Sequence, residues 1–343
     1  MIVIDGAEGE GGGQMLRSSL TLSILTGKPF KLINIRAGRP KPGLAAQHLA
    51  SVLAAAKLCR AEYKGAALGS STLVFEPGTV KAGHFDFRVG TAGAVGLVLQ
   101  TVVLPAALRG ETSSEFVIAG GTHVAFAPSF DFLQTTWSAF LRHLGVHVEM
   151  ELTKPGFYPR GGGAIRAVVQ RSAGVVAKSF TEVVPFTNAG VRSIVASLPA
   201  GTNDRMAAAL ADGLRAEGVD AVVAKESWDN GPNAVAVIVN RQGTVPLTFA
   251  ALGEKGKPVE RVAADAVAQA LAWSRTGAAV DPYSGDQILL PLALANGESS
   301  FTVSEVTQHL LTHRDIISRF LATTVRIEGE LGAPGRVSMK PEL

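Results

Sequence analysis

The chain has 343 residues, 47% of them hydrophobic, a mean hydropathy of +0.25 and a formal net charge of +3. It is long enough for one large or two ordinary domains, and no stretch approaches the roughly 18 apolar residues of a membrane span, so we expect a soluble protein without a membrane partner. One cysteine excludes an intrachain disulfide and no signal peptide is expected, which together predict a cytoplasmic location, while the mild positive charge permits a nucleic-acid or phosphate partner.

The chain opens with a glycine-rich loop between a predicted strand at residues 2–4 and a predicted helix over residues 16–24. Glycine lets the backbone approach a ligand, and free N–H groups at a helix start attract anions. Glu8 and Glu10 lie in this loop, so a phosphate bound here would need a divalent cation beside the carboxylates. The spacing matches neither the P-loop nor the GxGxxG fingerprint. A tight turn with solvated carboxylates is the alternative.

A strand is predicted over residues 31–36, and a basic loop follows it over residues 37–43. The strand and the loop together contain four cationic residues, and the loop contains two prolines. A helix predicted over residues 44–60 comes next, with His48 in its first turns and Cys59 in its apolar pattern, where we expect a core residue. Guanidinium groups bind phosphate oxygens in pairs. The loop is therefore a candidate site for phosphate or RNA backbone, and a solvated loop is the alternative.

Further strands and helices alternate through the middle of the chain. Strands are predicted over residues 72–76, 84–89, 115–119 and 146–153, and helices over residues 95–108 and 130–144. Gln100 is the only large polar side chain in its apolar helix, so it either completes a hydrogen-bond network in the core or reaches a ligand.

An internal echo indicates repeated units, because residues 103–111 resemble residues 289–298. It predicts an α/β (α+β) fold that uses a βαβαββ-type unit more than once. The sequence pattern changes near Pro185, and the earlier pattern returns after Gly277, where a glycine-loop pattern resumes at residues 283–287. We therefore expect a discontinuous large domain, residues 1–184 and 278–343, with a small α/β domain inserted over residues 185–277.

The last informative segment carries two histidines. A helix beginning near Val306 would place His309 and His313 one turn apart on one face. Such a pair can bind metal, although no zincin-type glutamate accompanies it. A neutral imidazole is also a good phosphoryl nucleophile. A residue on the helix surface is the alternative.

Taken together, these segments resemble the RNA 3′-terminal phosphate cyclase family, in its catalytic branch. The resemblance rests on residues 5–17 (DGAxGEGGGQxLR), 35–43 (IRAGRxKPG), 47–48 (QH), 120–122 (GGT), 127–128 (AP), 157–163 (FYPxGGG), 286–287 (DQ) and 309–312 (HLLT). It covers nearly the whole chain. It implies a large domain of repeated βαβαββ units, like the C-terminal domain of a translation initiation factor, with a smaller α/β domain inserted.

The resemblance implies an ATP-dependent ligase of the nucleotidyl-transfer type that acts in RNA processing. In that family a histidine takes AMP from ATP and passes it to an RNA 3′-phosphate, and the neighbouring 2′-OH then forms a 2′,3′-cyclic phosphate. The implied partners are ATP, Mg²⁺ or Mn²⁺, and RNA with a 3′-terminal phosphate, and the sequence leaves open whether the chain is a homodimer. The implied site comprises the nucleophile His309; the ATP-binding residues Gln100, Pro128, Tyr283, Ser284, Gly285, Asp286 and Gln287; the phosphate-binding residues Arg17, Arg36, Arg39 and His48; and the metal ligand Glu10.

Two positions depart from the family pattern. His123 stands where relatives often carry Asn or Asp, and His313 stands where a small or amide residue is expected. His313 therefore competes with His309 for the role of nucleophile, and the position of His309 before Leu-Leu-Thr favours His309.

Two other functions compete with a cyclase. One is a cyclase-like factor without catalytic activity that acts in RNA processing or ribosome assembly, and the presence of His309, Glu10 and Arg17 argues against it. The other is an enolpyruvyl transferase, which uses related repeat units and forms no covalent nucleotide.

Overall fold

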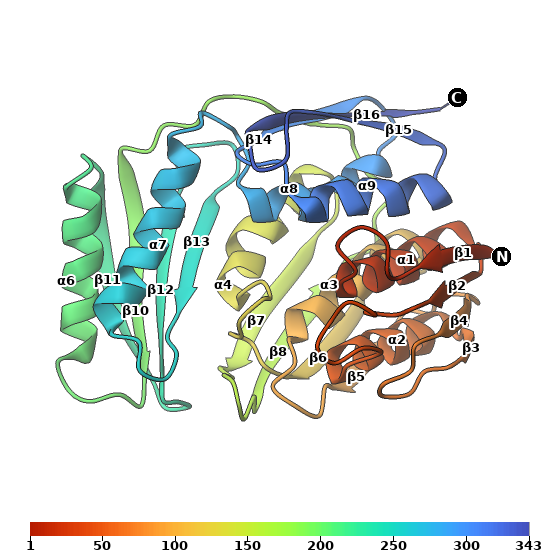
Figure 1. The fold of residues 1–343 in the computed structure, drawn as a ribbon, viewed down its shortest axis with the longest axis horizontal. Helices are drawn as coiled ribbons and strands as arrows, with labels where there is room; N and C mark the ends of the chain where they lie inside the picture. The colour runs from red at the N-terminus through yellow and green to blue at the C-terminus, as the bar shows by residue number, and fades with distance from the viewer. Residues whose placement is uncertain (343) are drawn as a thin grey trace.

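The structure, a computed structural model, describes residues 1–342, which form four four-stranded sheets with helices packed against them (Figure 1). This mixed architecture confirms the α/β (α+β) class expected from the sequence. Both ends of the described chain lie on the same side of the molecule. No helix within residues 1–342 has the length and apolar character needed to cross a bilayer.

The first sheet shows the repeated topology. Its elements in chain order are β1 (Ile2–Asp5), α1 (Gly13–Thr26), β2 (Phe30–Ile33), α2 (Ala46–Cys59), β3 (Glu62–Lys64) and β4 (Leu73–Glu76). Strand β2 runs parallel to β1 and antiparallel to β4, so the spatial order is β1-β2-β4-β3.

Two further sheets have the same order of first, second, fourth and third strand. The second unit contains β5 (His84–Arg88), α3 (Val95–Arg109), β6 (Ser114–Gly120), α4 (Phe130–Phe132), the π-helical turn η1 (Leu133–Trp137), α5 (Ser138–His143), β7 (Val148–Lys154) and β8 (Gly163–Val169). The third contains β9 (Ser179–Phe180), α8 (Pro282–Ala293), β14 (Ser299–Val303), α9 (Gln308–Phe320), β15 (Thr323–Glu328) and β16 (Gly335–Pro341). The three sheets confirm the repeated βαβαββ unit.

A fourth sheet interrupts the third repeat between β9 and α8. It contains β10 (Asn188–Ala196), α6 (Thr202–Arg215), β11 (Asp220–Trp228), β12 (Asn233–Asn240), β13 (Leu247–Leu252) and α7 (Val259–Ser274), with strand order β11-β10-β12-β13. All these elements fall between residues 185 and 277. The division into two domains at those positions stays a prediction.

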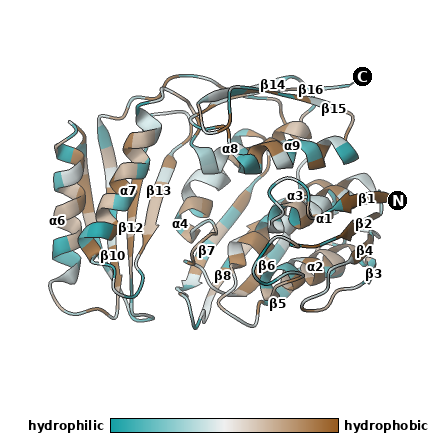
Figure 2. Cartoon of the chain, in the orientation of Figure 1, coloured by the Kyte–Doolittle hydropathy of each residue, from teal (hydrophilic) through white to brown (hydrophobic). Residues whose placement is uncertain are grey.

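Helix packing buries the apolar core. Helix α1 packs against α2, α3 and α9, and α8 packs against α9. Cys59 at the end of α2 is buried in this core, as its apolar surroundings in the sequence predict. In the inserted sheet the central strand β12 is buried from Ala234 to Asn240, and Figure 2 shows it as strongly hydrophobic. A strand buried on both faces reads as a continuous apolar run, as this one does.

Two predicted elements differ from the structure near the glycine loops. The strand predicted over residues 31–36 ends at Ile33, because Asn34 and Arg36 adopt left-handed φ angles of 52° and 54° that turn the chain into the basic loop. The helix predicted over residues 130–144 forms, but its hydrogen-bond pattern is interrupted by η1.

The prediction of a glycine loop at residues 283–287 was wrong, because these residues form the start of α8. The Asp281 carboxylate accepts hydrogen bonds of 3.0 Å from the N–H groups of Tyr283 and Ser284, and Pro282 occupies the first helical position. Both features are helix-start signals. Gly285 serves close packing instead, since a Cβ there would lie 2.8 Å from Val303 Cγ2.

We expect the substitution Gly43→Ala to destabilise the protein by at least about 1–2 kcal/mol, the cost of a left-handed conformation for an L-residue. Gly43 ends the basic loop at a φ of 78°, and a Cβ there would lie 2.2 Å from the carbonyl oxygen of Gly69. Urea denaturation measures the effect. The control is Gly38→Ala in the same loop, where a Cβ meets no atom within 4 Å and the change stays within about 0.5 kcal/mol. Equal stabilities of the two variants would contradict this account.

Candidate active site

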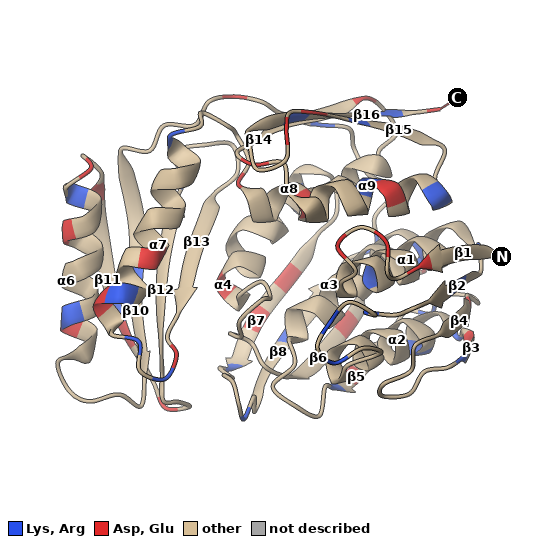
Figure 3. Cartoon of the chain, in the orientation of Figure 1, with Lys and Arg blue, Asp and Glu red and all other residues tan. Residues whose placement is uncertain are grey.

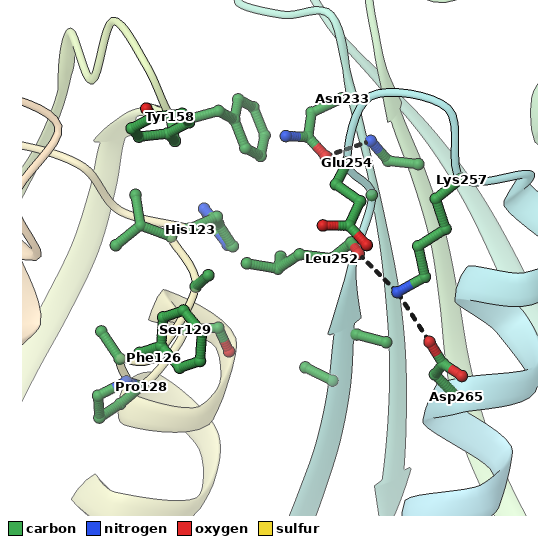
Figure 4. Close-up of a pocket in the computed structure, with 18 of the residues that line it drawn as sticks. His123, Phe126, Pro128, Ser129, Tyr158, Asn233, Leu252, Glu254, Lys257 and Asp265 are labelled. Atoms are coloured by element: carbon green, nitrogen blue, oxygen red, sulfur yellow. Dashed lines mark hydrogen bonds and ion pairs between the residues drawn. The ribbon is translucent and has the colours of Figure 1, made fainter. Parts of the chain in front are cut away.

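A cavity of about 1670 Å³ lies between the repeat units and the inserted sheet. Side chains from the starts of α1, α8 and α9 line one part of it. Figure 4 shows another part, where His123, Phe126, Pro128 and Tyr158 face Leu252, Glu254 and Lys257 from the inserted sheet and its following loop. Residues of all three repeats and of the insertion therefore share one concave surface, the kind of feature in which ligand sites occur.

His309 lies in the first turn of α9, lines the cavity, and has a side chain that is half exposed. Its Nδ1 lies 3.1 Å from the Oε1 of Gln14, and because a carbonyl oxygen only accepts, Nδ1 carries the proton. In a neutral ring the lone pair is then on Nε2. No hydrogen bond within residues 1–342 occupies that Nε2. The imidazole is thus oriented with a free nucleophilic nitrogen.

Gln14 is fixed by a second contact. Its Nε2 donates to the Oδ2 of Asp286 over 3.2 Å, which sets the amide orientation that presents Oε1 to His309. Burial raises the pKa of the Asp286 carboxyl to about 7, although hydrogen bonds from Gln287 and Gln14 and the charge of Arg17 act in the opposite direction. Gln14 belongs to the glycine-loop motif, but sequence reasoning gave it no role. Only the spatial proximity of α1, α8 and α9 reveals it.

His313 lies one turn after His309, as predicted, but it is buried. Its Nδ1–H donates to the carbonyl oxygen of Asp286 over 2.8 Å, and its Nε2 accepts from the Ser18 hydroxyl over 2.9 Å. Burial lowers the pKa of His313 to about 4. Both ring nitrogens are occupied, so the geometry favours His309 over His313 as a nucleophile.

Glu10 connects the acidic loop to this histidine. Its Oε1 is paired with Arg39, so the acidic loop before α1 lies against the basic loop before α2 (Figure 3). Its Oε2 is buried without a hydrogen-bond partner and lies 3.6 Å from the Nδ1 of His309. Buried carboxylate oxygens are rarely left unpaired, and a divalent cation is a natural partner for one. Glu10 therefore fits the role of metal ligand.

The structure groups no three His, Cys, Asp or Glu side chains as a metal cage within residues 1–342. Mg²⁺ in phosphate-transfer sites is commonly held by one or two carboxylates together with waters and substrate phosphates. A single orphaned oxygen of Glu10 is compatible with that mode of binding.

The predicted phosphate-binding residues surround the start of α1. Arg17 lines the cavity, and burial lowers its pKa to about 10, so it remains cationic at neutral pH beside Asp286 and Glu10. Burial, with the charges of Arg17 and Arg36, lowers the pKa of His48 to about 3. The Nδ1 of His48 accepts from the backbone N–H of Ala45 over 3.2 Å, which leaves a proton on Nε2. His48 is thus a neutral donor.

Arg36 is held at the base of the basic loop. Its Nη1 donates to the carbonyl oxygen of Gly43 over 2.8 Å, and partial burial lowers its pKa. Arg39 in contrast reaches across to Glu10. Arg36 therefore ties the two ends of the basic loop together, and Arg39 ties this loop to the acidic loop. Neither side chain lines the large cavity.

The predicted nucleotide-binding residues separate into two groups. Pro128, Tyr283, Asp286 and Gln287 line the cavity, and Gln100 donates to the Oε1 of Gln287 over 2.6 Å. Ser284 and Gly285 lie behind the cavity wall: the Ser284 hydroxyl is fully buried against Asp281, and Gly285 packs on β14.

A partly buried ion network that the sequence did not predict links the second repeat to the insertion. His123 is buried and bonds through Nε2 to Asp131 over 2.8 Å. Arg192 of β10 pairs with Asp131 and with Glu226 of β11. Burial opposes ionisation of Asp131, yet His123 and Arg192 keep its pKa below the usual value. Asp131 and Arg192 are 61 residues apart in the sequence, so no local pattern indicates their contact.

We expect His313 to keep a proton on Nδ1 and to titrate with a pKa of about 4, which histidine ¹⁵N–¹H correlation spectra measure directly. A histidine in the unfolded chain titrates near 6.5, so the unfolded state binds a proton before folded His313 does. The buried neutral ring therefore contributes its full stabilisation above pH 6.5, and this contribution is lost as the pH falls toward 4. The variant His313→Ala assigns the signal, and the variant His147→Ala, at an exposed histidine, is the control that leaves this signal in place. A proton on Nε2 of His313 would contradict the assignment.

Comparison with known proteins assigns the family. The sequence model of a family described as RNA 3′-terminal phosphate cyclase matches residues 8–327. A protein from Salmonella agona (strain SL483) named RNA 3′-terminal phosphate cyclase is 42% identical over 329 residues, which cover 96% of this chain and 94% of that one. Proteins of the same name from Pyrococcus furiosus and Methanopyrus kandleri are 39% and 40% identical, cover 98% and 100% of this chain, and are themselves covered over 98% and 99% of their lengths. The chain therefore belongs to the RNA 3′-terminal phosphate cyclase family.

Proposed function

We propose that this protein is an ATP-dependent RNA 3′-phosphate cyclase that converts an RNA 3′-phosphate to a 2′,3′-cyclic phosphate. The single observation that carries the proposal is the state of His309: Nδ1–H is bound to Gln14, Nε2 is free, and the ring lines a large cavity beside Arg17. The names of the family and of its relatives support the same reaction. ATP and RNA ending in a 3′-phosphate are the proposed substrates.

In the first step the Nε2 of His309 forms a bond to the α-phosphorus of ATP, and the bond from that phosphorus to pyrophosphate breaks. The ring becomes positively charged as the P–N bond forms. Its Nδ1–H is already directed at the Oε1 of Gln14, so the developing charge of the ring meets the dipole of that amide. These groups need little reorganisation during the reaction.

In the second step an oxygen of the RNA 3′-phosphate attacks the AMP phosphorus, and the electron pair of the P–N bond returns to Nε2. In the third step the 2′-OH attacks the 3′-phosphorus, its proton departs, and AMP leaves with the bridging oxygen. The two reacting groups are already on one ribose, which gives the cyclisation an intramolecular advantage.

The other residues are proposed to bind and orient. Arg17, Arg36, Arg39 and His48 hold phosphates of the RNA end or of ATP, each charged hydrogen bond contributing about 1.5–3 kcal/mol. Pro128, Tyr283, Asp286 and Gln287 bind the nucleoside part of ATP, with Gln100 holding Gln287 in place. Glu10 holds Mg²⁺ or Mn²⁺, and the bound metal supplies neutralisation of triphosphate charge.

The substitution His309→Ala is expected to reduce covalent labelling by α-³²P-ATP at least about 1000-fold, because no other side chain supplies the attacking nitrogen. Acid-labile, alkali-stable label on the protein, mapped to one peptide by mass spectrometry, is the measurement. His147→Ala, an exposed histidine outside the cavity, is the matched control and keeps full labelling. Label retained by His309→Ala, or found on His313, would refute the nucleophile. A wild-type protein that never labels would favour the non-catalytic alternative.

The substitution Glu10→Gln is expected to raise the Mg²⁺ or Mn²⁺ concentration for half-maximal labelling about tenfold or more, which corresponds to a loss of about 1.4 kcal/mol. The amide keeps an oxygen that can accept from Arg39 but removes the charge of the orphaned oxygen. Glu8→Gln in the same loop is the control, because Glu8 is paired with Arg319 and exposed. Identical metal titrations for Glu10→Gln and the wild type would remove Glu10 from the metal site.

A further inference from the structure

The cavity is larger than a nucleotide site requires. Small-molecule pockets typically measure roughly 300–1,000 Å³, whereas this one has about 1670 Å³. The proposed ATP contacts use the starts of α1 and α8 together with Pro128. The walls shown in Figure 4, around Tyr158 on one side and Lys257 on the other, have no role in that set.

Two exposed aromatic rings stand on one wall of this unused part. Phe126 is fully exposed at 104% and Tyr158 is 77% exposed, and both line the cavity. Phe126 adopts a φ of 61°, a conformation that a bulky residue rarely takes and that often marks a functional position. Exposed rings in a groove are the usual platforms on which unpaired bases stack.

The turn that carries Tyr158 is held firmly. Its neighbour Phe157 is buried and packs against His123 and Trp228, with ring centroids 5.6 Å and 6.2 Å away. The backbone N–H of Gly161 donates to the carbonyl oxygen of Phe157 over 2.6 Å, which closes the turn. The Tyr158 ring is therefore exposed from an ordered base rather than from a loose loop.

Cations without a carboxylate partner flank the rings. Arg160 lies in the same turn and Lys255 on the opposite wall, both exposed and both lining the cavity. Neither has an ion pair within residues 1–342, whereas Lys257 beside them is paired with Asp265 over 2.7 Å. Unpaired cations on two sides of a groove complement a phosphodiester backbone.

This wall is continuous with the phosphate-binding loops. A Cβ on Gly161 would lie 2.9 Å from the Cα of Ala92, so the turn touches the loop before α3. That loop in turn is bound to α2, because the N–H of Ala94 donates to the side chain of Gln47 over 3.2 Å, next to His48. An RNA end held near His48 can thus continue onto the turn without leaving the surface.

We infer that the cavity also binds the single-stranded RNA preceding the terminal phosphate, with bases stacked on Phe126 and Tyr158 and phosphodiesters contacted by Arg160 and Lys255. The identity of the RNA end rests on the proposed function. Unpaired bases are required, because bases already stacked within a duplex present no free face to the two rings. The inference assigns substrate selection to a surface shared by the second repeat and the insertion.

Fluorescence anisotropy with 3′-phosphorylated oligoribonucleotides of three and ten nucleotides tests the aromatic contacts. The wild type is expected to bind the longer RNA at least about tenfold more tightly, since each stacked base contributes roughly 5- to 150-fold. In Phe126→Ala/Tyr158→Ala that ratio falls toward one. Tyr63→Ala, an exposed aromatic on β3 outside the cavity, keeps the wild-type ratio. Both rings are exposed, so the variants are expected to fold, which circular dichroism verifies.

Equal affinity for the two lengths, or an unchanged ratio in the double variant, would overturn the inference. So would binding of a blunt duplex as tightly as the ten-nucleotide strand. Loss of ATP labelling in the double variant would place the rings in the nucleotide site instead. The labelling assay needs no RNA and the length ratio needs no ATP, so a failure of the proposed function and a failure of this inference are distinguishable.

A salt titration tests the cations separately. The slope of log affinity against log salt for the ten-nucleotide RNA is expected to decrease by about 0.7 for each lost phosphate contact in Arg160→Gln and in Lys255→Gln. Lys64→Gln on β3 is the control and leaves the slope unchanged. Parallel slopes for all three variants and the wild type would remove both cations from the RNA path.

Discussion

The side-chain amide of Gln14 is the contact on which the site depends. One end accepts from His309 and the other donates to Asp286, so a single residue of α1 fixes groups on α9 and α8. A buried amide that lost either partner would leave a polar atom unsatisfied, which typically costs about 1–3 kcal/mol. His313 strengthens the same arrangement by bonding Ser18 on α1 and the backbone of Asp286 on α8. The protonation pattern of the proposed nucleophile is thus a consequence of how three helices pack.

The repeated unit explains why these helices meet. Helices α1, α3 and α8 are the first helices of the three βαβαββ units, and each brings an amide or carboxylate to the centre: Gln14, Gln100 and Asp286 with Gln287. The pair between Gln100 and Gln287 joins the second and third units as Gln14 joins the first and third. The first and third units both carry a histidine in the first turn of the second helix, His48 and His309, and of these two His309 lines the cavity whereas His48 does not. Repetition therefore supplies the framework, and the two histidines differ in whether the cavity reaches them.

Local sequence patterns predicted most of the elements and the family, because glycine loops, apolar periodicity and short motifs depend on neighbouring residues. The grouping of His309 with Glu10 and Arg17 followed from the family resemblance, and the structure brings them together. Patterns could not reveal Gln14 as a bridge or Arg192 as the partner of Asp131, since those contacts join distant segments. The start of α8 differs from the predicted glycine loop because Asp281 caps a helix there, and the helix contains the glycine of the motif. The exposure of Phe126 and the burial of Ser284 likewise depend on tertiary packing.

The two-residue strand β9 has a consequence for the order in which parts of the protein can fold. Ser179 is aligned with Ser300, 121 positions further along, and everything between β9 and α8 must emerge from the ribosome before this pairing exists. Pairings over such spans form late, because the chain must first be brought back on itself. The first two sheets and the inserted one use nearer partners and can form earlier. A truncated product lacking the last forty residues would therefore keep the acidic loop and the basic loop but lack α9, and with it the proposed nucleophile His309.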